Sequence, residues 1–311
     1  MLKAEEILQI IDKRKNRKFQ IINNNFKTEN MKTENILVIG GTGKTGRRVA
    51  ENLTQSGHNV RVVGRKTNPA FDWENPETYD AALKDMDRAY IVYYPDLAVP
   101  GSRDAITALT EKALEAGLEK VVLLSGKGET EAEACEDIVA NSGLNYTLVR
   151  ASWFNQNFSE GAFLDFVLDG VVALPMPEAE IPFVDADDIA DVVSNVLVND
   201  SYNGQTITVT GPQKRTFKEV VGIMAEASDK HIQFVPISID EFKDGMRKAG
   251  LPDSYVWLFG YLFQEVLGNP DNQDVSNDVA KVLGRPAKDF ETYARQTAAT
   301  GIWNAEITQT K

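Results

Sequence analysis

The sequence predicts an α/β fold in which a doubly wound parallel sheet is followed by a smaller, mainly helical domain. Three observations predict it. Short apolar runs alternate with helix-length segments between residues 35 and 150, and this alternation is typical of a parallel sheet covered by helices. A glycine-rich stretch joins the first apolar run to the first helical segment. The alternation ends after Arg150, where prolines and then helix-capping residues follow.

The apolar runs of the first half are short and rich in Val, Ile and Leu, as expected of strands buried on both faces. They span Asn35–Ile39, Val60–Val63, Ala89–Tyr94, Val121–Leu124 and Tyr146–Val149. The segments predicted to be helical are Lys44–Gln55, Ala105–Ala116 and Glu131–Asn141. Because parallel strands need long crossovers, each helix is expected to connect two neighbouring strands.

The second half is predicted to begin with loops over residues 151–182, which contain three prolines. A helix is expected behind Asp187 and Asp188, both of which are good N-cap types, and a strand over Thr206–Thr210. Thr216 and Ser238 are each followed three residues later by Glu, so two capping boxes should open further helices. The last 60 or so residues are expected to be mainly helical.

Composition excludes several classes of function. The 311-residue chain is 42% apolar and carries a net charge of -13, so nucleic-acid and anionic-membrane partners are not expected. Cys135 is its single cysteine, which excludes an intrachain disulfide and agrees with a cytoplasmic protein. Only two histidines are present, and helix capping accounts for Asp187 or Asp188, so no metal is expected. No apolar run approaches the ~18 residues of a membrane span.

Residues 1–34 are interpreted as an N-terminal extension, disordered or helical, that precedes the fold. Charged residues interrupt its apolar positions, so it does not have the pattern of a secretory signal. Met31 stands just before the first predicted strand, which makes a later translation start conceivable.

The stretch IGGTGKTGRR, residues 39–48, allows two interpretations. An ATP-binding P-loop that ends at Gly43-Lys44-Thr45 would need glycine at position 38, which is Val38. The dinucleotide fingerprint fits instead, because its glycines follow a buried strand and open a helix. The residues expected to hold the pyrophosphate are Gly40, Gly41, Thr42, Gly43, Lys44, Thr45 and Gly46.

The second strand indicates which dinucleotide is bound. NAD sites usually carry Asp or Glu at its end, but this chain has Arg65 and Lys66 there and no acid before Asp72. Arg can pair bidentately with a phosphate. NADP(H) is therefore favoured over NAD(H), and the alternative is that both cations are solvated surface charges.

Motifs in a consistent order extend this interpretation over most of the chain. They are NILVIGGTGKTGRRVAENL, VVGRK, FDWENPETYDAAL, VVLLSGKG, SGLNYTLVRASWFNQNF, IPFVDADDIADVV, NGQTITVTGP and DFETYARQTAATGIW. Together they cover residues 35–303. On these motifs the chain resembles the NmrA-like group of atypical short-chain dehydrogenases/reductases.

The resemblance implies a Rossmann domain made of residues 35–150 and about 183–211, and a substrate domain made of residues 151–182 and 212–311. It also implies one of two functions. The first is an NADPH-dependent reductase of a small quinone, azo, imine or enone acceptor. The second is a non-catalytic NAD(P)-binding redox sensor that regulates a protein partner.

The catalytic residues are left open. Short-chain dehydrogenases usually use Tyr-x-x-x-Lys, but the helix in question reads ETEAEACEDIVANSG and contains neither residue. Ser125 stands where the family serine does. Lys127 and Glu136 are further candidates, although a solvated lysine and a surface carboxylate are the simpler interpretations. An enzyme is favoured over a sensor, since hydride transfer to an activated acceptor needs mainly orientation and an apolar site.

The walls of the site are predicted from the ends of the strands, where ligands bind in doubly wound sheets. Tyr93 and Ser125 are expected beside the cofactor. Tyr94, Trp153, Phe154 and Asn157 are expected beside the substrate. Core packing is the alternative for the aromatic residues, and bracing of a loop is the alternative for Asn157.

Overall fold

The computed structural model describes residues 32–304, so the prediction for the N-terminal extension lies almost entirely outside the described residues. Six parallel strands form one sheet in the order β2-β1-β3-β4-β5-β7. They are β1 Asn35–Ile39, β2 Asn59–Val63, β3 Arg88–Ile91, β4 Lys120–Gly126, β5 Asn145–Ala151 and β7 Gln205–Val209. The strand order reverses between β1 and β3, because β2 lies on one side of β1 and β3 on the other.

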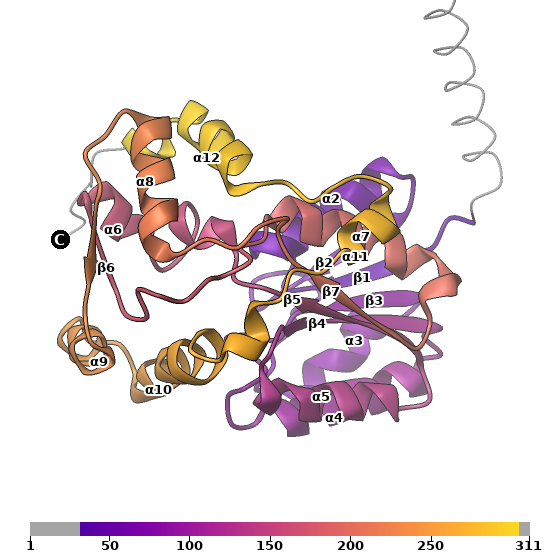
Figure 1. Cartoon of the computed structure of the whole chain (residues 1–311). Helices are drawn as coiled ribbons and strands as arrows, with labels where there is room; N and C mark the ends of the chain where they lie inside the picture. Colours follow the sequence, from indigo (N-terminus) through magenta and orange to yellow (C-terminus); the bar gives the residue numbers. More distant parts are fainter. Residues whose placement is uncertain (1–31, 305–311) are drawn as a thin grey trace, which may run out of the picture. The chain divides into compact units, whose positions relative to one another are not determined.

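Helices cover both faces of this sheet, as the sequence predicted (Figure 1). On one face lie α3 Tyr79–Leu83, α4 Ser102–Glu115 and α5 Thr130–Ala140. On the other lie α2 Lys44–Gln55, α7 Ala186–Val198 and α11 Asp278–Leu283. In β1, Ile36 and Val38 pack in the core on the α2 and α7 side of the sheet. Leu37 and Ile39 pack in the core on the α4 and α5 side, so this central strand is buried on both sides. The predicted doubly wound, Rossmann-like fold is confirmed.

The boundaries of the predicted elements shift by a few residues. The third strand ends at Ile91 and not at Tyr94, so the segment that follows it already belongs to the edge where ligands bind. Helix α7 begins one residue after Asp185, whose side chain accepts from the backbone N–H of Asp187 at 2.8 Å. The prediction of Asp187 or Asp188 as the N-cap was wrong, because both of these carboxylates bind cations from other parts of the chain.

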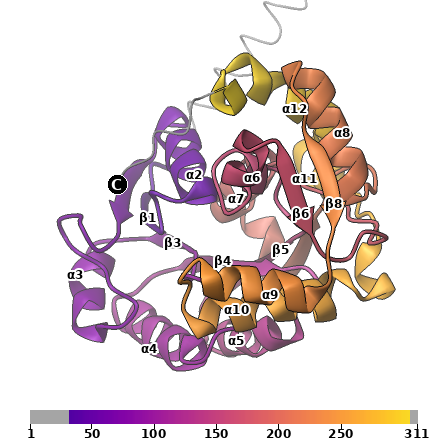
Figure 2. The ribbon, with the colours of Figure 1, turned by 90° about the vertical axis from the view of Figure 1, so that its left-hand side faces the viewer.

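The elements outside the six-stranded sheet and its covering helices form a second body of structure, which was only partly predicted (Figure 2). Strands β6 Val171–Leu174 and β8 Gln233–Pro236 form a separate parallel pair. Its helices are α6 Leu164–Leu168, α8 Phe217–Ser228, α9 Ile239–Lys248, α10 Asp253–Tyr261 and α12 Phe290–Ala299. The described residues also contain the π-helix η4 Leu262–Leu267 and the 3-10 helices η1 Pro76–Thr78, η2 Asn155–Phe158, η3 Asp200–Tyr202, η5 Pro270–Gln273 and η6 Ile302–Asn304.

The capping boxes and the missed strand pair have different explanations. Both predicted boxes are present, at Thr216 with Glu219 and at Ser238 with Glu241. Residues 151–182 are not only loop, since they contain η2, α6 and β6. Strands β6 and β8 were missed because they pair only with each other and stand outside the strand–helix alternation that marks the main sheet.

Aromatic side chains fill the core of this second body. Phe217 is fully buried, and its ring centroid lies 5.7 Å from that of Phe183 and 6.0 Å from that of Phe263. Trp153 extends the cluster, with its ring 5.5 Å from Phe263.

Helix α11 falls within the predicted substrate domain but packs on the six-stranded sheet. The predicted domain boundaries stay a prediction. Within residues 32–304, no helix is long and apolar enough to cross a bilayer.

Replacing Phe217 by Ala should lower the free energy of unfolding by about 3–5 kcal/mol, because it leaves a cavity among packed rings. Urea unfolding followed by far-UV circular dichroism measures the loss. Leu114→Ala, at a side chain that is 49% exposed, is the control and should cost about 0.5 kcal/mol or less. Equal losses for the two variants would contradict the assignment of Phe217 to the centre of the core.

Candidate functional site

The glycine turn between β1 and α2 depends on the absence of side chains. Gly40 has a φ of +74°, and its carbonyl accepts the N–H of Gly43 at 2.9 Å. A Cβ at Gly41 would lie 2.3 Å from Cγ1 of Val62, and one at Gly46 would lie 2.3 Å from the carbonyl oxygen of Gly40. Both distances are far below van der Waals contact, so any other residue at these two positions would displace the turn.

The first turn of α2 has the features of an anion-binding site. Its N-cap residue, Gly43, offers no side-chain acceptor, and no acidic residue occupies the first turn. The free N–H groups and the positive end of the helix dipole are therefore left for a ligand. Thr42 and Gly43 are exposed, so the approach to these groups is open. The pyrophosphate of a dinucleotide fits a turn and helix of this kind.

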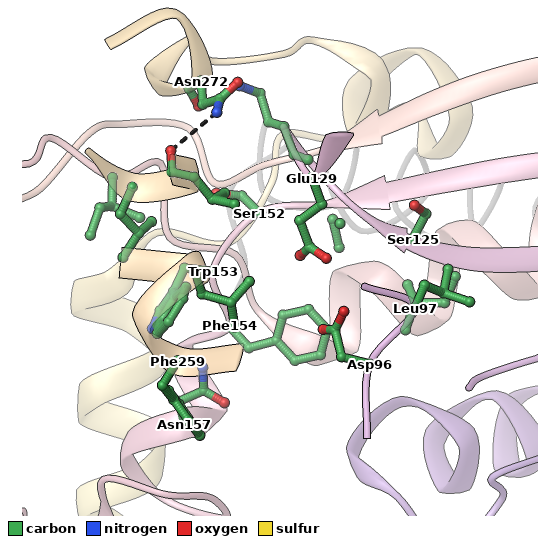
Figure 3. Close-up of a pocket in the computed structure, with 18 of the residues that line it drawn as sticks. Asp96, Leu97, Ser125, Glu129, Ser152, Trp153, Phe154, Asn157, Phe259 and Asn272 are labelled. Carbon is green, nitrogen blue, oxygen red and sulfur yellow. Dashed lines mark hydrogen bonds between the residues drawn. The ribbon is translucent and has the colours of Figure 1, made fainter. Parts of the chain in front are cut away.

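A cavity of about 290 Å³ lies at the carboxyl ends of β3, β4 and β5 (Figure 3). Its sheet side is formed by Tyr93, Ser125 and Ser152, which follow or end these strands. Its other side is formed by residues from the second body, among them Phe259 and Leu262. Lys44 of the glycine turn also lines it, so the cavity adjoins the predicted phosphate site.

The match to known families shows which class of ligand the chain binds. Residues 40–200 match the family model described as NAD(P)H-binding. The chain belongs to this NAD(P)H-binding family. The match favours the dinucleotide interpretation of IGGTGKTGRR over the P-loop, and the residues that hold the cofactor stay a prediction.

The most similar relatives of this NAD(P)H-binding protein extend over nearly its whole length. The Prestalk A differentiation protein A of Dictyostelium discoideum is 28% identical over 84% of this chain and 92% of its own. The NAD(P)H azoreductase of Xenophilus azovorans is 28% identical over 85% of this chain and 98% of its own.

Solved structures share the fold at lower identity. The NADPH-dependent quinone oxidoreductase QOR2 of Escherichia coli, solved with NADPH, has a TM-score of 0.71 at 19% identity, covering 84% of this chain and 99% of its own. The negative transcriptional regulator NmrA, solved with NAD, has a TM-score of 0.67 at 18% identity, covering 88% and 99%. The resemblance to the NmrA-like group is confirmed.

The structure brings seven of the predicted site residues of this NAD(P)H-binding protein to one place. They are Lys44, Tyr93, Ser125, Lys127, Trp153, Phe154 and Asn157, all of which line the cavity. Burial lowers the pKa of Lys44 and raises that of Tyr93. The hydroxyl of Ser125 is buried and has no hydrogen-bond partner among the described residues. An unpartnered hydroxyl that lines the cavity is what a bound ligand would satisfy.

Other predicted residues have different surroundings. Lys127 does not carry a freely solvated amine, because its Nζ donates to the backbone carbonyl of Asn272. Tyr94 is 63% exposed and its hydroxyl bonds that of Tyr255 at 2.6 Å, outside the cavity lining. Arg65 and Lys66 are exposed beyond the end of β2, also outside this lining. Their proposed contact with a 2′-phosphate stays a prediction.

Glu136 is the predicted candidate that the structure places elsewhere. Its side chain is 3% exposed and accepts from Arg150 at 3.0 Å and 2.6 Å, with both carboxylate oxygens engaged. It does not line the cavity. The alternative of a surface carboxylate was also wrong, because the side chain is buried. A bidentate pair between Arg150 and this buried carboxylate holds α5 against β5.

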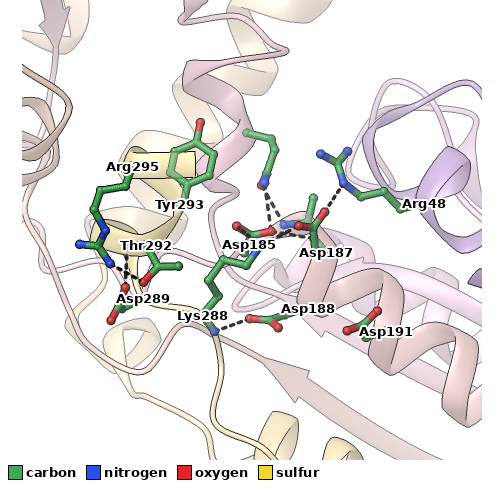
Figure 4. A network of polar contacts seen from close by, with 12 residues as sticks. Arg48, Asp185, Asp187, Asp188, Asp191, Lys288, Asp289, Thr292, Tyr293 and Arg295 are labelled. Atoms are coloured by element: carbon green, nitrogen blue, oxygen red, sulfur yellow. Dashed lines mark hydrogen bonds and ion pairs between the residues drawn. The ribbon is translucent and has the colours of Figure 1, made fainter. Parts of the chain in front are cut away.

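A polar network joins the glycine-turn helix to the second body (Figure 4). Arg48 of α2 donates to Glu160 and to Asp187, each at 2.6 Å. Lys288, just before α12, donates to the same Asp187 at 2.6 Å. The network connects α2, α7 and the segment after η2. It therefore helps to fix the loop that carries Asn157 beside Lys44.

Two of the residues that line the cavity were not predicted from the sequence. Asp96, after β3, and Glu129, before α5, both line the cavity, and each carboxyl group affects the pKa of the other. Burial raises the pKa of both carboxyls, and the charge of Asp96 adds to the increase at Glu129. No motif links them, because their proximity depends only on β3 and β4 being neighbours in the sheet.

Replacing Gly46 by Ala should weaken NADPH binding at least about tenfold, because the new Cβ displaces the Gly40 carbonyl and with it the turn. Calorimetric titration of purified protein measures the affinity. Gly222→Ala in α8 is the matched control, since its Cβ would meet nothing within 4 Å. Undiminished NADPH binding by Gly46→Ala would show that the turn does not hold the cofactor.

Proposed function

We propose that this protein is an NADPH-dependent reductase that transfers a hydride to a small unsaturated acceptor of the quinone, azo, imine or enone type. The observation that carries the proposal is the cavity beside the glycine turn. Its wall includes Phe154, Phe163, Phe259 and Leu262, so it suits a flat, largely apolar molecule. The azoreductase and the quinone oxidoreductase to which the chain is similar are named for acceptors of this kind.

The roles of the chain's own residues follow from their positions. The glycine turn and the start of α2 would hold the pyrophosphate, and the cofactor would supply the hydride. Among residues 32–304, the hydroxyl of Ser125 has no hydrogen-bond partner and is available to the cofactor or the acceptor. The indole N–H of Trp153 has none within the same residues, so the apolar wall carries polar groups that can orient a ligand.

A preference for NADPH over NADH is part of the proposal. Arg65 and Lys66 follow β2 directly after Gly64, where NAD-binding proteins usually carry an acid. Their side chains are exposed, so a 2′-phosphate could reach them without displacing other partners. A phosphate–guanidinium pair is stronger than a pair with a ribose hydroxyl.

A regulatory function is the second candidate. Helix α5 carries neither Tyr nor Lys, so the usual proton-transfer pair of short-chain dehydrogenases is absent from it. NmrA shares the fold and is described as a transcriptional regulator. On this alternative the protein binds the dinucleotide without turnover, and its affinity for a protein partner depends on the cofactor. A pulldown with and without NADPH tests it.

Purified protein supplied with NADPH should oxidise it in the presence of at least one quinone, azo or iminium compound. Absorbance of NADPH across a panel of such acceptors measures the rate. Background oxidation without protein, and with Gly46→Ala, is the control. NADPH binding without turnover on any acceptor would contradict the reductase and favour the regulator.

Replacing Arg65 by Ala should weaken NADPH binding about 10- to 100-fold and leave NADH binding unchanged, because only the 2′-phosphate is lost as a partner. Titration calorimetry with both cofactors measures the two affinities. Lys218→Ala, at an exposed lysine of α8, is the control for a loss of surface charge. Equal weakening of NADPH and NADH would show that Arg65 does not contact the 2′-phosphate.

A further inference from the structure

We propose that Asp96 and Glu129 together form the proton donor of the reduction, and so determine which acceptors the protein can reduce. This inference rests on the proposed reductase function and deepens it. The two side chains converge on one side of the cavity from different parts of the chain (Figure 3). They are the acids that line the cavity among the described residues, and the usual Tyr–Lys pair is missing from α5.

Local geometry fixes both carboxyl groups. The backbone N–H of Ala98 donates to Oδ1 of Asp96 at 2.8 Å, which orients that side chain. Glu129 lies against Gly126 at the end of β4, where a Cβ would be 1.7 Å from its Oε1. Glycine at position 126 therefore makes room for the Glu129 carboxyl beside Ser125, at the edge of the sheet where the ligand is expected.

A proton is needed to hold these two groups together. Two ionised carboxylates that line the same side of one cavity repel each other, so a proton on one of them is favoured. The pKa of both carboxyls is raised, in agreement with this repulsion and with their burial. Both acids line the cavity without being fully buried, so an acceptor in it can reach them.

The charged and titratable neighbours do not supply a compensating cation. Glu136 of α5 is the next acid, and it is already paired with Arg150. Lys127 directs its amine to the carbonyl of Asn272. The remaining neighbours whose titration is linked to the pair are Cys135 and Tyr261, with Lys44 elsewhere in the cavity lining.

In the proposed mechanism, Asp96 and Glu129 supply the proton that accompanies the hydride. Reduction of a neutral quinone or azo group by NADPH takes up one hydride and one proton, and yields NADP⁺ and the two-hydrogen product. In the proposed step a carboxyl O–H bond breaks while an O–H or N–H bond forms on the acceptor. The carboxylate then regains its proton from solvent. A cationic acceptor needs the hydride alone, so its reduction should not depend on the pair.

Two acceptors separate the roles of hydride and proton. Turnover at saturating benzoquinone should fall about 100-fold or more in Glu129→Gln, the size of effect expected for a general acid. Turnover of a cationic triphenylmethane dye should stay within about twofold of the unaltered protein, because that reaction consumes no proton. Asp96→Asn should behave like Glu129→Gln. Glu131→Gln, at an exposed acid of α5, is the matched control and should change neither rate.

The rate of benzoquinone reduction should also fall as pH rises through the raised pKa of the pair, while the rate with the dye should not follow this profile. Equal losses with both acceptors in Glu129→Gln would overturn the proposal, because they indicate a positioning or folding defect. Unchanged benzoquinone turnover would overturn it as well. In either case the reductase function stands, whereas a protein that reduces neither acceptor nor any other compound defeats both.

Stability without cofactor provides a readout that does not depend on turnover. A raised pKa means that the folded chain keeps a proton which the unfolded chain loses near the ordinary carboxyl value of 4.5. The free energy of unfolding then falls as pH rises from that value to the raised pKa. Glu129→Gln removes this titration, so its stability relative to the unaltered protein should increase over the same pH range. A constant difference would show that no shared proton is held.

Discussion

The close approach of Gly46 to Gly40 is the contact on which the site depends. A single methyl group at position 46 would lie 2.3 Å from the Gly40 carbonyl oxygen. This contact brings the first turn of α2 against the end of β1, so that its N–H groups meet the edge of the sheet. Lys44 of this turn lines the same cavity as Tyr93 and Ser152, which stand at the ends of neighbouring strands.

The cavity is a consequence of how two bodies of structure share one edge. The parallel sheet places the ends of β3, β4 and β5 together, and the chain then leaves the sheet to build an aromatic core of its own. Rings from that core return as the opposite wall of the cavity. Arg48, Asp187 and Lys288 tie the two bodies together by charge, close to the cofactor turn.

Helix α5 has no Tyr–Lys pair, and in this arrangement its buried polar side chain has a structural use. Helix α5 uses its buried acid, Glu136, to hold Arg150. The acids that face the cavity come instead from the segment between β3 and α4, at Asp96, and from the turn between β4 and α5, at Glu129. A Rossmann-like fold can thus keep its glycine turn while a different pair of side chains lines the cavity at the ends of its strands. Fold alone does not determine the chemistry.

The sequence by itself determined the strand–helix alternation, the glycine turn and both capping boxes. Each of these is local, because the residues that form it are near neighbours along the chain. Tertiary structure decided the rest. It made Asp185 the cap of α7, paired β6 with β8, buried Glu136 against Arg150 and joined Asp96 to Glu129. These features depend on which distant segments become neighbours, and the order of strands in a sheet leaves no local pattern in the sequence.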